Sequence, residues 1–555
     1  MLKCGVGVIL CVFCSGWALA QTQEEKQNLM GTTMAPRIVN IVNFIRGVEP
    51  RTDVDLLLPV VKQLELIKQH GLPATFLIQY DAMEQERFVI LLKEQLPQQC
   101  ELGGWFEVVQ PMVEAAGLKW RGRYPWDWHV NVGFSVGYPP AEREKLVDVF
   151  MEKFKNTFGY LPKSVGSWFL DAHTLGYMAD KYGVSASCNC KDQIGTDGYT
   201  LWGGYWNQAY YPSRKNAYMP AQHAGGQIPV PVFRMLGSDP IYQYDAGFGE
   251  AAQSVVTLEP AYKDGGGNPS WVRWFFRTLT DAPCLAFAYT QVGQENSFGW
   301  PVMGEGLTDQ IGLLEELSKQ GKVRVETLAA SAEWFRNTFR TTPETTVTAL
   351  EDWKDEGRAS VWYNSRYYRV NVFWDKEKMC IRDIHMFDER YAERYLTAVE
   401  PSSSCIYDTL PVVDGFRWST QETRAGLTPV ATVNGQTIPL SGRAPIVEET
   451  RDGKLRVRWP LLDIGELEAL FQKETMQFQI TGVPAELNWG LQLAWSGEKK
   501  VPITETRPQE IVYKYNGFIY SLAVPQGTVG RIPGEPAITI HPQDGKIRVL
   551  LRNPR

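Results

Sequence analysis

Residues 159–184, GYLPKSVGSWFLDAHTLGYMADKYGV, carry the pattern that decides the fold. The apolar run SVGSWFL predicts a buried strand, Asp171 closes that strand, and a helix is expected to begin near Thr174. A strand followed at once by a helix is the βα unit from which parallel sheets are built. The residue that closes such a strand lies at the end of the sheet where barrels place their chemistry.

The same unit repeats on both sides of this stretch, from residue 36 to residue 340. Amphipathic helices are expected at Asp55–His70, Ala141–Phe158 and 309–320, with apolar strand-like runs between them. These runs are RIVNIVNFI (37–45), ATFLIQY (74–80), QCELGGWF (99–106), SVGSWFL (164–170), GVSASCNC (183–190), CLAFAYTQ (284–291) and KVRVETL (322–328). A closing helix is expected at SAEWFRNTF (331–339). Such alternation makes a doubly wound sheet or a barrel, and about 300 residues suits a (β/α)7–8 barrel, here placed at residues 21–345.

The pattern changes after residue 345. Segments such as SRYYRVNVFW (365–374), KLRVRWPLL (454–462) and KIRVLLR (546–552) alternate apolar and polar residues between turn residues. This alternation is typical of antiparallel sheets. We therefore expect an α/β fold in which the barrel is followed by β-rich, sandwich-like domains: a small α+β or β domain at 346–430 and a β-sandwich at 431–555.

Residues 1–20 predict a signal peptide. Lys3 gives a positive start, GVGVILCVFC (5–14) is an apolar run, and Ala18-Leu19-Ala20 is a small-x-small cleavage site. The run is shorter than the roughly 20 residues of a membrane-spanning helix, and no later segment approaches that length without charges. We expect cleavage after Ala20 and a periplasmic or secreted protein with no membrane span.

The composition argues against nucleic acid as a partner. The net charge is −7, whereas binding to nucleic acid requires a basic face. The chain has 19 Trp and 24 Tyr residues, whose rings pack in cores and also stack on the C–H faces of sugars. Six cysteines lie beyond residue 20, too few for a disulfide scaffold. Cys188 and Cys190 have no second pair or His cluster that would complete a metal site.

The order of the runs ATFLIQY, CELGGWFEVVQP and GYLPKSVGSWFLDAHTLGYMADKYGV resembles the layout of polysaccharide deacetylases. That family carries an ATFF-type strand, then HEIGxHxxxH, then GxxPxxxRPPxG and a helix ending in LGY or LGV. The segment at 166–184 is also similar to the nucleophile strand of family 38 α-mannosidases, GWxIDPFGHS. The resemblance is clear over residues 74–183 and implies a barrel of the glycoside hydrolase and deacetylase group, which includes family 57.

The metal ligands of that group are missing from the matching positions. Deacetylases bind a metal through two histidines four residues apart, and these positions hold Trp105 and Val109, neither of which is a ligand. The first strand, NIVNFIRGVEPR (40–51), lacks the paired aspartates of the deacetylases and the HxHxD-like ligands of the mannosidases. We therefore predict a site without metal and without cofactor.

Two carboxylates are the leading catalytic candidates. Asp171 coincides with the nucleophile position of the mannosidase-like motif, although an Asp after a strand is also a common helix cap. Glu295 follows the run CLAFAYTQ, and the resemblance to family 57 implies a partner acid on a late strand; the alternative is a solvated loop residue. Glycoside cleavage needs one protonated and one ionised carboxyl group. Burial beside Phe298 or Trp300 would raise the pKa of Glu295.

Further acidic residues follow other strand-like runs: Glu49, Glu107 and Asp197. Glu49 is the strongest of them, because the first strand supplies catalytic residues throughout the barrel group that the chain resembles. Arg46 and Arg51 flank it. They either neutralise Glu49 or bind an acidic sugar through their planar guanidinium groups.

Two aromatic loops are expected to contact the substrate. Residues 199–218, YTLWGGYWNQAYYPSRKNAY, have neither helical nor strand periodicity and predict a long ordered loop, and Trp126–His129 has a similar composition. Rings that stack on sugars, with polar partners beside them, explain this composition better than core packing alone. The expected substrate-binding residues are His173, Trp105, Glu107, Asp127, His129, Asp197, Trp202, Trp206, Asn207, Arg214 and Trp300.

The sequence therefore predicts an exported glycoside hydrolase that acts on a poly- or oligosaccharide without metal. Asp171 would be the nucleophile or base and Glu295 the acid, with Glu49 as a further catalytic candidate. Two alternatives remain open: a metal-dependent deacetylase-like hydrolase with a relocated site, for example at Asp171, His173 and His129, and a non-catalytic glycan-binding protein on a decayed barrel.

Overall fold

The computed structural model describes residues 35–190, 204–250, 252–433, 436–462, 464–482, 487–532 and 534–554. The predicted signal peptide and the candidates Asp197 and Trp202 lie outside these ranges.

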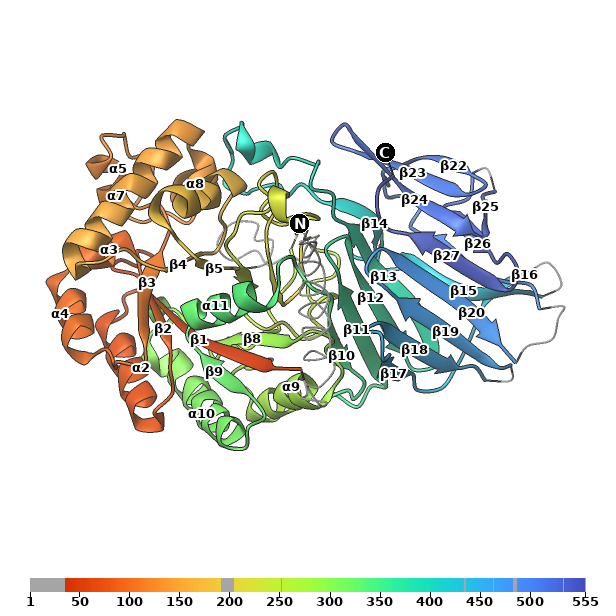
Figure 1. The fold of residues 1–555 in the computed structure, drawn as a ribbon, viewed down its shortest axis with the longest axis horizontal. Coiled ribbons are helices and arrows are strands. Elements are labelled where there is room, and N and C mark those ends of the chain that lie inside the picture. The colour runs from red at the N-terminus through yellow and green to blue at the C-terminus, as the bar shows by residue number, and fades with distance from the viewer. Residues whose placement is uncertain are drawn as a thin grey trace, which may run out of the picture.

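A curved sheet of parallel strands forms the first part of the molecule, as the sequence predicted (Figure 1). Its strands are β1 (Arg37–Ile45), β2 (Thr75–Ile78), β3 (Glu101–Trp105), β4 (Ser164–Ser167), β5 (Ala186–Asn189), β6 (Ala209–Tyr210), β7 (Val232–Arg234), β8 (Ala288–Val292) and β9 (Arg324–Glu326). The order is β6-β7-β5-β4-β3-β2-β1-β8, with β9 also paired to β1 and only β6 antiparallel to its neighbour. The rings of Phe233 on β7 and Tyr289 on β8 meet at 4.8 Å, so side chains bring the two ends together into a nearly closed barrel.

Helices follow the strands and cover the outside of the barrel (Figure 1). The α-helices are α2 (Leu57–His70), α3 (Tyr80–Met83), α4 (Glu86–Gln95), α5 (Gln110–Ala115), α6 (Val130–Gly133), α7 (Pro140–Phe158), α8 (Ala172–Tyr182), α9 (Pro269–Asp281), α10 (Trp300–Lys319) and α11 (Leu328–Thr338). Short 3-10 turns are η1 (Ser135–Gly137), η2 (Ala224–Gly226), η3 (Asn296–Phe298) and η4 (Arg394–Leu396). The predicted helices match α2, α7 and α11, whereas α10 begins nine residues before its prediction because Pro301 fits the first turn of a helix.

The barrel interior is filled by side chains. Alternate residues of the strands, among them Phe44, Leu77, Trp105 and Tyr289, belong to one buried cluster that also includes Leu328 of α11. Helix α11 closes the end at which the strands begin, because the backbone N–H of Leu328 donates to Thr75 Oγ1 at 2.8 Å. The opposite end, where the strands finish, is therefore the place for a functional site.

Two antiparallel sheets make up the rest of the chain (Figure 1). The first has β10 (Thr345–Ala349), β11 (Arg358–Asn364), β12 (Tyr368–Asp375), β13 (Lys378–Met386), β14 (Leu410–Asp414), β15 (Gly426–Val433), β16 (Gln436–Pro439), β21 (Trp489–Ala494), β25 (Thr528–Gly530) and β26 (Ala537–His541). The second has β17 (Ile446–Glu449), β18 (Leu455–Pro460), β19 (Glu466–Phe471), β20 (Thr475–Thr481), β22 (Ile503–Arg507), β23 (Glu510–Tyr515), β24 (Phe518–Gln526) and β27 (Lys546–Leu550). Strand β15 contains residue 430, the predicted boundary. It pairs with β21, and β21 pairs with β26, so the segments on either side of this boundary share one sheet.

The barrel and the sheets are joined by buried contacts. Trp206, from the loop before β6, stacks on Trp362 of β11 with ring centroids 4.2 Å apart and planes 4° apart. The carboxylate of Glu449 accepts hydrogen bonds from the backbone N–H groups of Cys284 and Leu285 at 2.7 and 2.8 Å. Aromatic packing and a charged anchor thus fix the second part of the chain against the first.

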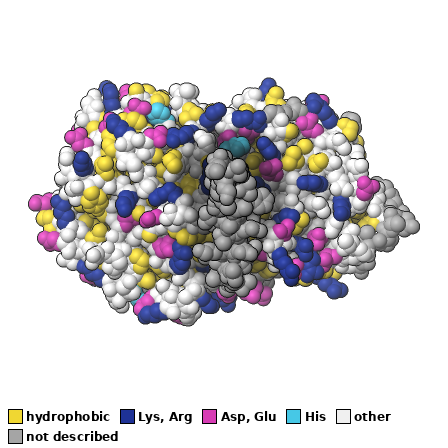
Figure 2. All heavy atoms as spheres, viewed as in Figure 1, with side chains coloured by type: hydrophobic (Ala, Val, Ile, Leu, Met, Phe, Trp, Pro, Cys, Tyr) yellow, Lys and Arg dark blue, Asp and Glu magenta, His cyan; other side chains and the backbone are white. Residues whose placement is uncertain are grey.

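The surface carries charges of both signs. On the face shown in Figure 2, Lys and Arg side chains are interspersed with Asp and Glu. Within the part of the chain that the structure describes, no helix is long and apolar enough to cross a membrane.

Candidate functional site

Four charged side chains meet at the end of the barrel where the strands finish, and Arg46 is at their centre. Arg46 follows β1, and its guanidinium binds Glu107, which follows β3, through Nε at 3.2 Å and Nη2 at 3.1 Å. Nη1 lies 3.1 Å from Oε2 of Glu295, which follows β8, and 3.8 Å from Oε2 of Glu49. The structure therefore brings together Glu49, Glu107 and Glu295, three of the acids that the sequence singled out. We call Arg46 and these three glutamates the Arg46 cluster.

The loop after β8 is fastened to the end of β1 by Asn296. Its side-chain oxygen accepts from the backbone N–H of Arg46 at 2.9 Å, and its side-chain nitrogen donates to the carbonyl of Arg46 at 2.9 Å. These two bonds continue the pairing of β1 with β8 past the end of the strands. They fix Glu295, the residue before Asn296, beside the guanidinium.

The acids of the cluster have different electrostatic surroundings. Burial raises the pKa of Glu295, and the charge of Arg46 opposes this only in part. Burial also favours the neutral form of Glu49, but hydrogen bonds from Arg51, at 2.8 Å to each carboxylate oxygen, outweigh it and lower its pKa. Glu295 is thus harder to ionise than an ordinary glutamate, and Glu49 is easier to ionise. Arg46 itself is fully buried, yet its pKa is raised because Glu107 and Glu295 outweigh its desolvation.

Asp81 is a neighbour of the cluster that the sequence analysis missed. It stands in the first turn of α3, directly after β2, and its Oδ1 accepts from the backbone N–H of Gly47 at 3.2 Å. Burial raises its pKa to about 7, and the negative charge of Glu107 adds to this. The signal was present in IQYDAM (78–83), where polar residues follow an apolar strand, as they do at Glu107 and Glu295.

The loop Trp126–His129 approaches the cluster through its first residue. The indole N–H of Trp126 donates to Glu107 Oε2 at 3.2 Å, and the guanidinium of Arg46 lies 4.2 Å from the centre of the ring. Asp127 is ion-paired with Arg123 at 2.7 Å, which lowers its pKa to about 2. Asp127 also accepts a hydrogen bond from the backbone N–H of His129 at 3.1 Å, a contact within the same loop. The sequence singled out the loop that contains Trp126, but did not name Trp126 among the individual site residues.

Asp171 has a separate set of partners. It is the N-cap of α8 and is fully buried, and its carboxylate accepts from the backbone N–H of Thr174 at 2.9 Å and from Ser135 Oγ at 2.6 Å. Arg143 is ion-paired with it at 3.1 Å. None of these partners also contacts Glu295, whose partners are Arg46 and Ser297. The contact with Thr174 is that of the helix-cap alternative, and no contact joins Asp171 to Glu295 among the described residues.

Most of the remaining candidates are packing or surface residues. Trp105 is wholly inside the barrel, stacked on Phe44 at 4.1 Å. Trp206 packs on β11, and Asn207 is buried and donates to the carbonyl of Ser238 at 3.0 Å. Three others lie at or near the surface: His173 beside Glu144 at 3.1 Å, Arg214 paired with Asp180 at 2.9 Å, and Trp300, half-buried in the first turn of α10.

The residues present do not fit the divalent metal that the resemblance implies. Val109 is buried against the core outside the barrel, and Trp105 belongs to the interior packing. The position among the carboxylates, where a cation would bind, is filled by the guanidinium of Arg46. In the described ranges, no group of three or more His, Cys, Asp or Glu side chains is placed to hold a metal ion.

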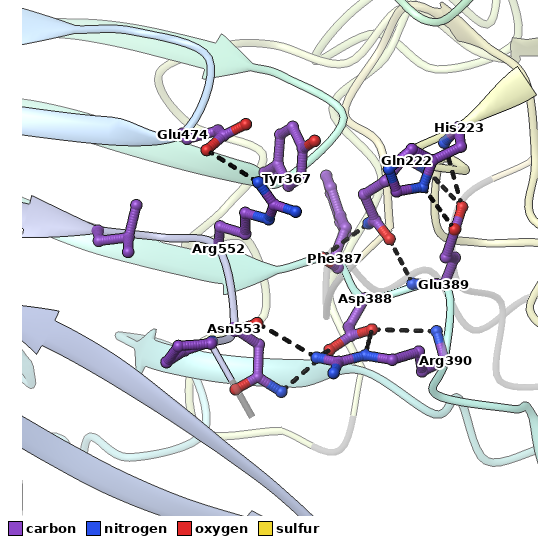
Figure 3. Close-up of a pocket in the computed structure, with 12 residues that line it drawn as sticks. Gln222, His223, Tyr367, Phe387, Asp388, Glu389, Arg390, Glu474, Arg552 and Asn553 are labelled. Atoms are coloured by element: carbon purple, nitrogen blue, oxygen red, sulfur yellow. Dashed lines mark hydrogen bonds and ion pairs between the residues drawn. The ribbon is translucent and has the colours of Figure 1, made fainter.

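A separate cavity of about 520 Å³ lies where a barrel loop, the ends of β12 and β13 and the last residues meet (Figure 3). Its charged side chains are paired with one another: His223 with Glu389 at 2.8 Å, Arg390 with Asp388, and Arg552 with Glu474 at 3.7 Å. The first pair joins the barrel loop to the segment after β13, and the third joins the last residues of the chain to Glu474, just before β20. None of the residues that the sequence proposed for the site lines this cavity.

No protein-family model matches this chain, and no curated protein matches it. Among solved structures, it is similar to a candidate glycoside hydrolase/deacetylase from Parabacteroides distasonis, with a TM-score of 0.49 and 15% identity over 69% of this chain and 91% of the other. It is also similar to a candidate polysaccharide deacetylase from Mycobacterium smegmatis, with a TM-score of 0.35 and 12% identity over 57% of this chain and 95% of the other. A third is the α-amylase AmyC from Thermotoga maritima, with a TM-score of 0.29 and 11% identity over 55% and 75%.

These structures come from the group that the sequence resemblance named. At these identities and TM-scores, the likeness is one of fold.

Proposed function

We propose that the protein is a carbohydrate-active hydrolase that cleaves glycosidic bonds at the Arg46 cluster, with Glu295 as the general acid and Glu49 as the nucleophile. The observation that carries this proposal is that the carboxyl groups of Glu295 and Glu49 both approach one nitrogen, Arg46 Nη1. Their surroundings differ, because burial raises the pKa of Glu295 and hydrogen bonds from Arg51 lower the pKa of Glu49. Environments that push the pKa values of neighbouring acids apart are the usual sign of an acid and a nucleophile or base.

The proposed reaction has two steps. Glu295 gives its proton to the leaving oxygen while the ionised carboxylate of Glu49 attacks the anomeric carbon and forms an ester. Glu295, now ionised, then takes a proton from water, and the resulting hydroxide releases the sugar and restores Glu49. Glu107, bound to Arg46 through two hydrogen bonds, positions the guanidinium between the reacting groups.

The product is expected to retain the configuration of the anomeric carbon. Oε2 of Glu295 lies 3.1 Å and Oε2 of Glu49 lies 3.8 Å from Arg46 Nη1, so the distance between the two oxygens cannot exceed the sum of these two distances. This geometry suits the separation of about 5 to 5.5 Å found in retaining enzymes better than the 6.5–9.5 Å that leaves room for water. Proton NMR of the product formed in the first minutes of the reaction checks the outcome, and an inverted anomer would contradict it.

Activity is tested on a panel of chromogenic glycosides and native polysaccharides, with and without chelator. Glu295→Gln and Glu49→Gln should each lower kcat about 10²-fold or more, because each removes a group that transfers a proton or forms a bond. Glu101→Gln is the matched control: Glu101 is a half-buried acid at the other end of the barrel, bonded to Thr75 and to the backbone of Ala329. Its activity per folded molecule should equal that of the wild type.

The same panel separates the alternatives. Loss of activity with chelator, or release of acetate, would favour the deacetylase-like hydrolase. Binding of glycans without turnover would favour a non-catalytic binding protein. We also propose that the protein acts in the periplasm or outside the cell, and N-terminal sequencing of the exported protein should then begin at Gln21.

A further inference from the structure

A cavity of about 280 Å³ lies where the two antiparallel sheets meet, between the start of β14, the loop before β22 and the end of β23. Three of the residues that line it are basic, namely Arg417, Lys500 and Lys514, and none is acidic. We call it the lysine pocket. It shares no residue with the Arg46 cluster, so the binding of a ligand here is independent of the proposed reaction.

Contacts between the sheets fix the walls of the lysine pocket. The hydroxyl group of Tyr520 donates to the carbonyl of Pro411 at 2.6 Å, which holds β14 against β24 (Figure 1). The backbone N–H of Lys514 donates to the carbonyl of Pro502 at 2.9 Å, so the loop that carries Lys500 lies beside the end of β23. The pocket is therefore formed by strands that pack on one another in the absence of a ligand.

Two of the three cations in the pocket have no counter-charge from the protein. Arg417 binds Asp414 through its Nε at 2.5 Å. Lys500 and Lys514 are exposed, and neither is paired with an acid in the part of the chain that the structure describes. Glu498 precedes Lys500 by two residues, but it does not line the pocket. A concave surface lined by charge of one sign concentrates ions of the opposite sign, so the pocket favours an anionic ligand.

The cations at the end of the barrel are different. Arg46 binds Glu107 at 3.1 Å and Arg51 binds Glu49 at 2.8 Å, as in the salt-bridge alternative that the sequence raised for these arginines. An acidic sugar would meet the negative charges of these glutamates there. The lysine pocket offers uncompensated positive charge instead.

We propose that the lysine pocket binds the acidic group of an anionic saccharide, such as a uronate residue. The ammonium groups of Lys500 and Lys514 bind its carboxylate. Tyr515, which is half-buried and hydrogen-bonded to Arg417, gives the pocket an aromatic surface for the C–H face of the sugar ring. The volume suits a single ring better than an extended polyanion, and the net charge of −7 opposes the approach of nucleic acid or of an anionic membrane.

The test is the double substitution Lys500→Gln with Lys514→Gln. Both side chains are exposed, so the melting temperature should not change. Calorimetry measures the binding of trisaccharides of galacturonate, glucuronate or mannuronate, and of the methyl ester of each. We expect at least one acidic trisaccharide to bind the wild type tenfold or more tightly than its methyl ester does, and to lose tenfold or more in affinity in the variant. Its affinity for the wild type should also fall as the salt concentration rises, because salt screens exposed charges.

The matched control is Lys378→Gln with Lys546→Gln. These lysines are exposed at the starts of β13 and β27, one in each sheet, and they do not line the pocket. The control removes the same amount of charge, and its affinity should equal that of the wild type. Equal losses in the two double variants would mean that the net charge, and not the pocket, attracts the saccharide, and that would overturn the inference.

Three other outcomes would also overturn it. The first is that no acidic trisaccharide binds more tightly than its methyl ester. The second is unchanged affinity in Lys500→Gln with Lys514→Gln. The third is that inorganic sulfate or phosphate displaces the trisaccharide at equal concentration, because the pocket would then bind an anion without recognising a sugar. These measurements need no turnover, so they stand whether or not Glu295 and Glu49 cleave a glycosidic bond.

Discussion

A single guanidinium serves three glutamates at the end of the barrel. Burying a carboxylate without a counter-charge costs several kcal/mol, and burying three close together adds their mutual repulsion. Arg46 reduces both costs, because its planar group can bind Glu107 through two atoms and still reach Glu295 and Glu49 with the third. Arg46 is therefore the cation common to all three acids, with a charge that persists at every accessible pH, and Arg51 also binds Glu49.

Arg46→Met should lower the free energy of unfolding by about 3–5 kcal/mol, because Glu107 and Glu295 would remain buried without their cation. The loss should be smaller at pH 5 than at pH 8, since protonation removes the uncompensated charge. Urea unfolding at the two pH values measures it. Arg123→Met is the control: Arg123 is largely exposed and also paired with an acid, and its removal should cost much less. Equal losses would mean that the Arg46 pairs contribute no more than a surface ion pair.

Asp81 should make stability depend on pH near neutrality. Its pKa is about 7 in the folded protein and 3.8 by itself, so the fold favours the protonated form. This contribution is fully present below pH 3.8 and is lost as the pH rises through about 7. Asp81→Asn should therefore flatten the decline of the unfolding free energy between pH 5 and 8, by up to about 1.4 kcal/mol per pH unit.

The control for Asp81 is Asp127→Asn. The pKa of Asp127 is about 2, so its titration affects stability only in acid. Denaturant unfolding across pH 5 to 8 should give the same slope for this variant as for the wild type. An unchanged slope in Asp81→Asn would show that Asp81 is ionised in the folded state.

From the sequence, an acidic side chain after an apolar run was the signal for a site residue, and the roles assigned on that ground stay predictions. Glu49, Glu107 and Glu295 were proposed on that ground, and they meet. Asp171 satisfied the same rule but caps a helix, because the chain turns directly from β4 into α8 and the carboxylate is needed by the first turn. In the sequence, Gln79 is part of the predicted strand 74–80. The register between β1 and β2 shows that it is level with Arg46.

At the scale of elements, helix α8 begins at a buried ionic contact. Asp171 caps its first turn and pairs with Arg143 of α7, whose guanidinium also donates to the carbonyls of Tyr395 and Ala398. Glu393 accepts from the backbone N–H of Ala172, and burial together with the charge of Asp171 raises its pKa to about 8. One charge network thus joins α7, α8 and the segment around η4.

Asp171→Asn should therefore act on stability. Neutralising one partner of a buried pair leaves Arg143 without its counter-charge, and we expect a loss of about 3–5 kcal/mol. The pKa of Glu393 should fall, because a nearby negative charge is removed. Thermal unfolding and hydrogen exchange of Ala172–Tyr182 measure the effect.

Activity per folded molecule should survive in Asp171→Asn if the reaction takes place at Glu295 and Glu49. Abolished turnover in a fully folded variant would return Asp171 to the catalytic role that its sequence position suggested. A buffered assay below the melting temperature, with the folded fraction measured by circular dichroism, separates the two results.

At the scale of the whole molecule, the barrel and the β-rich region were readable from periodicity, since strand–helix alternation and strand–turn alternation differ along the chain. The periodicity did not show that the segments before and after residue 430 share one sheet. Strand β15 pairs with β21, which lies more than 50 residues farther on, and alternation identifies which face of a strand is buried but not which distant strand it joins.

The stack of Trp206 on Trp362 should make the barrel and the sheets unfold together. Trp362 is fully buried, and its indole N–H donates to the carbonyl of Pro240 at 3.0 Å, so Trp362→Ala removes packing and a hydrogen bond at the junction. We expect a loss of about 3–5 kcal/mol and, in calorimetry, the separation of one transition into two. Trp459→Ala is the control, since Trp459 is equally buried but lies within the second sheet. Its loss should destabilise that sheet while leaving the junction contacts intact, and a single transition in both variants would show that coupling does not depend on the Trp206–Trp362 contact.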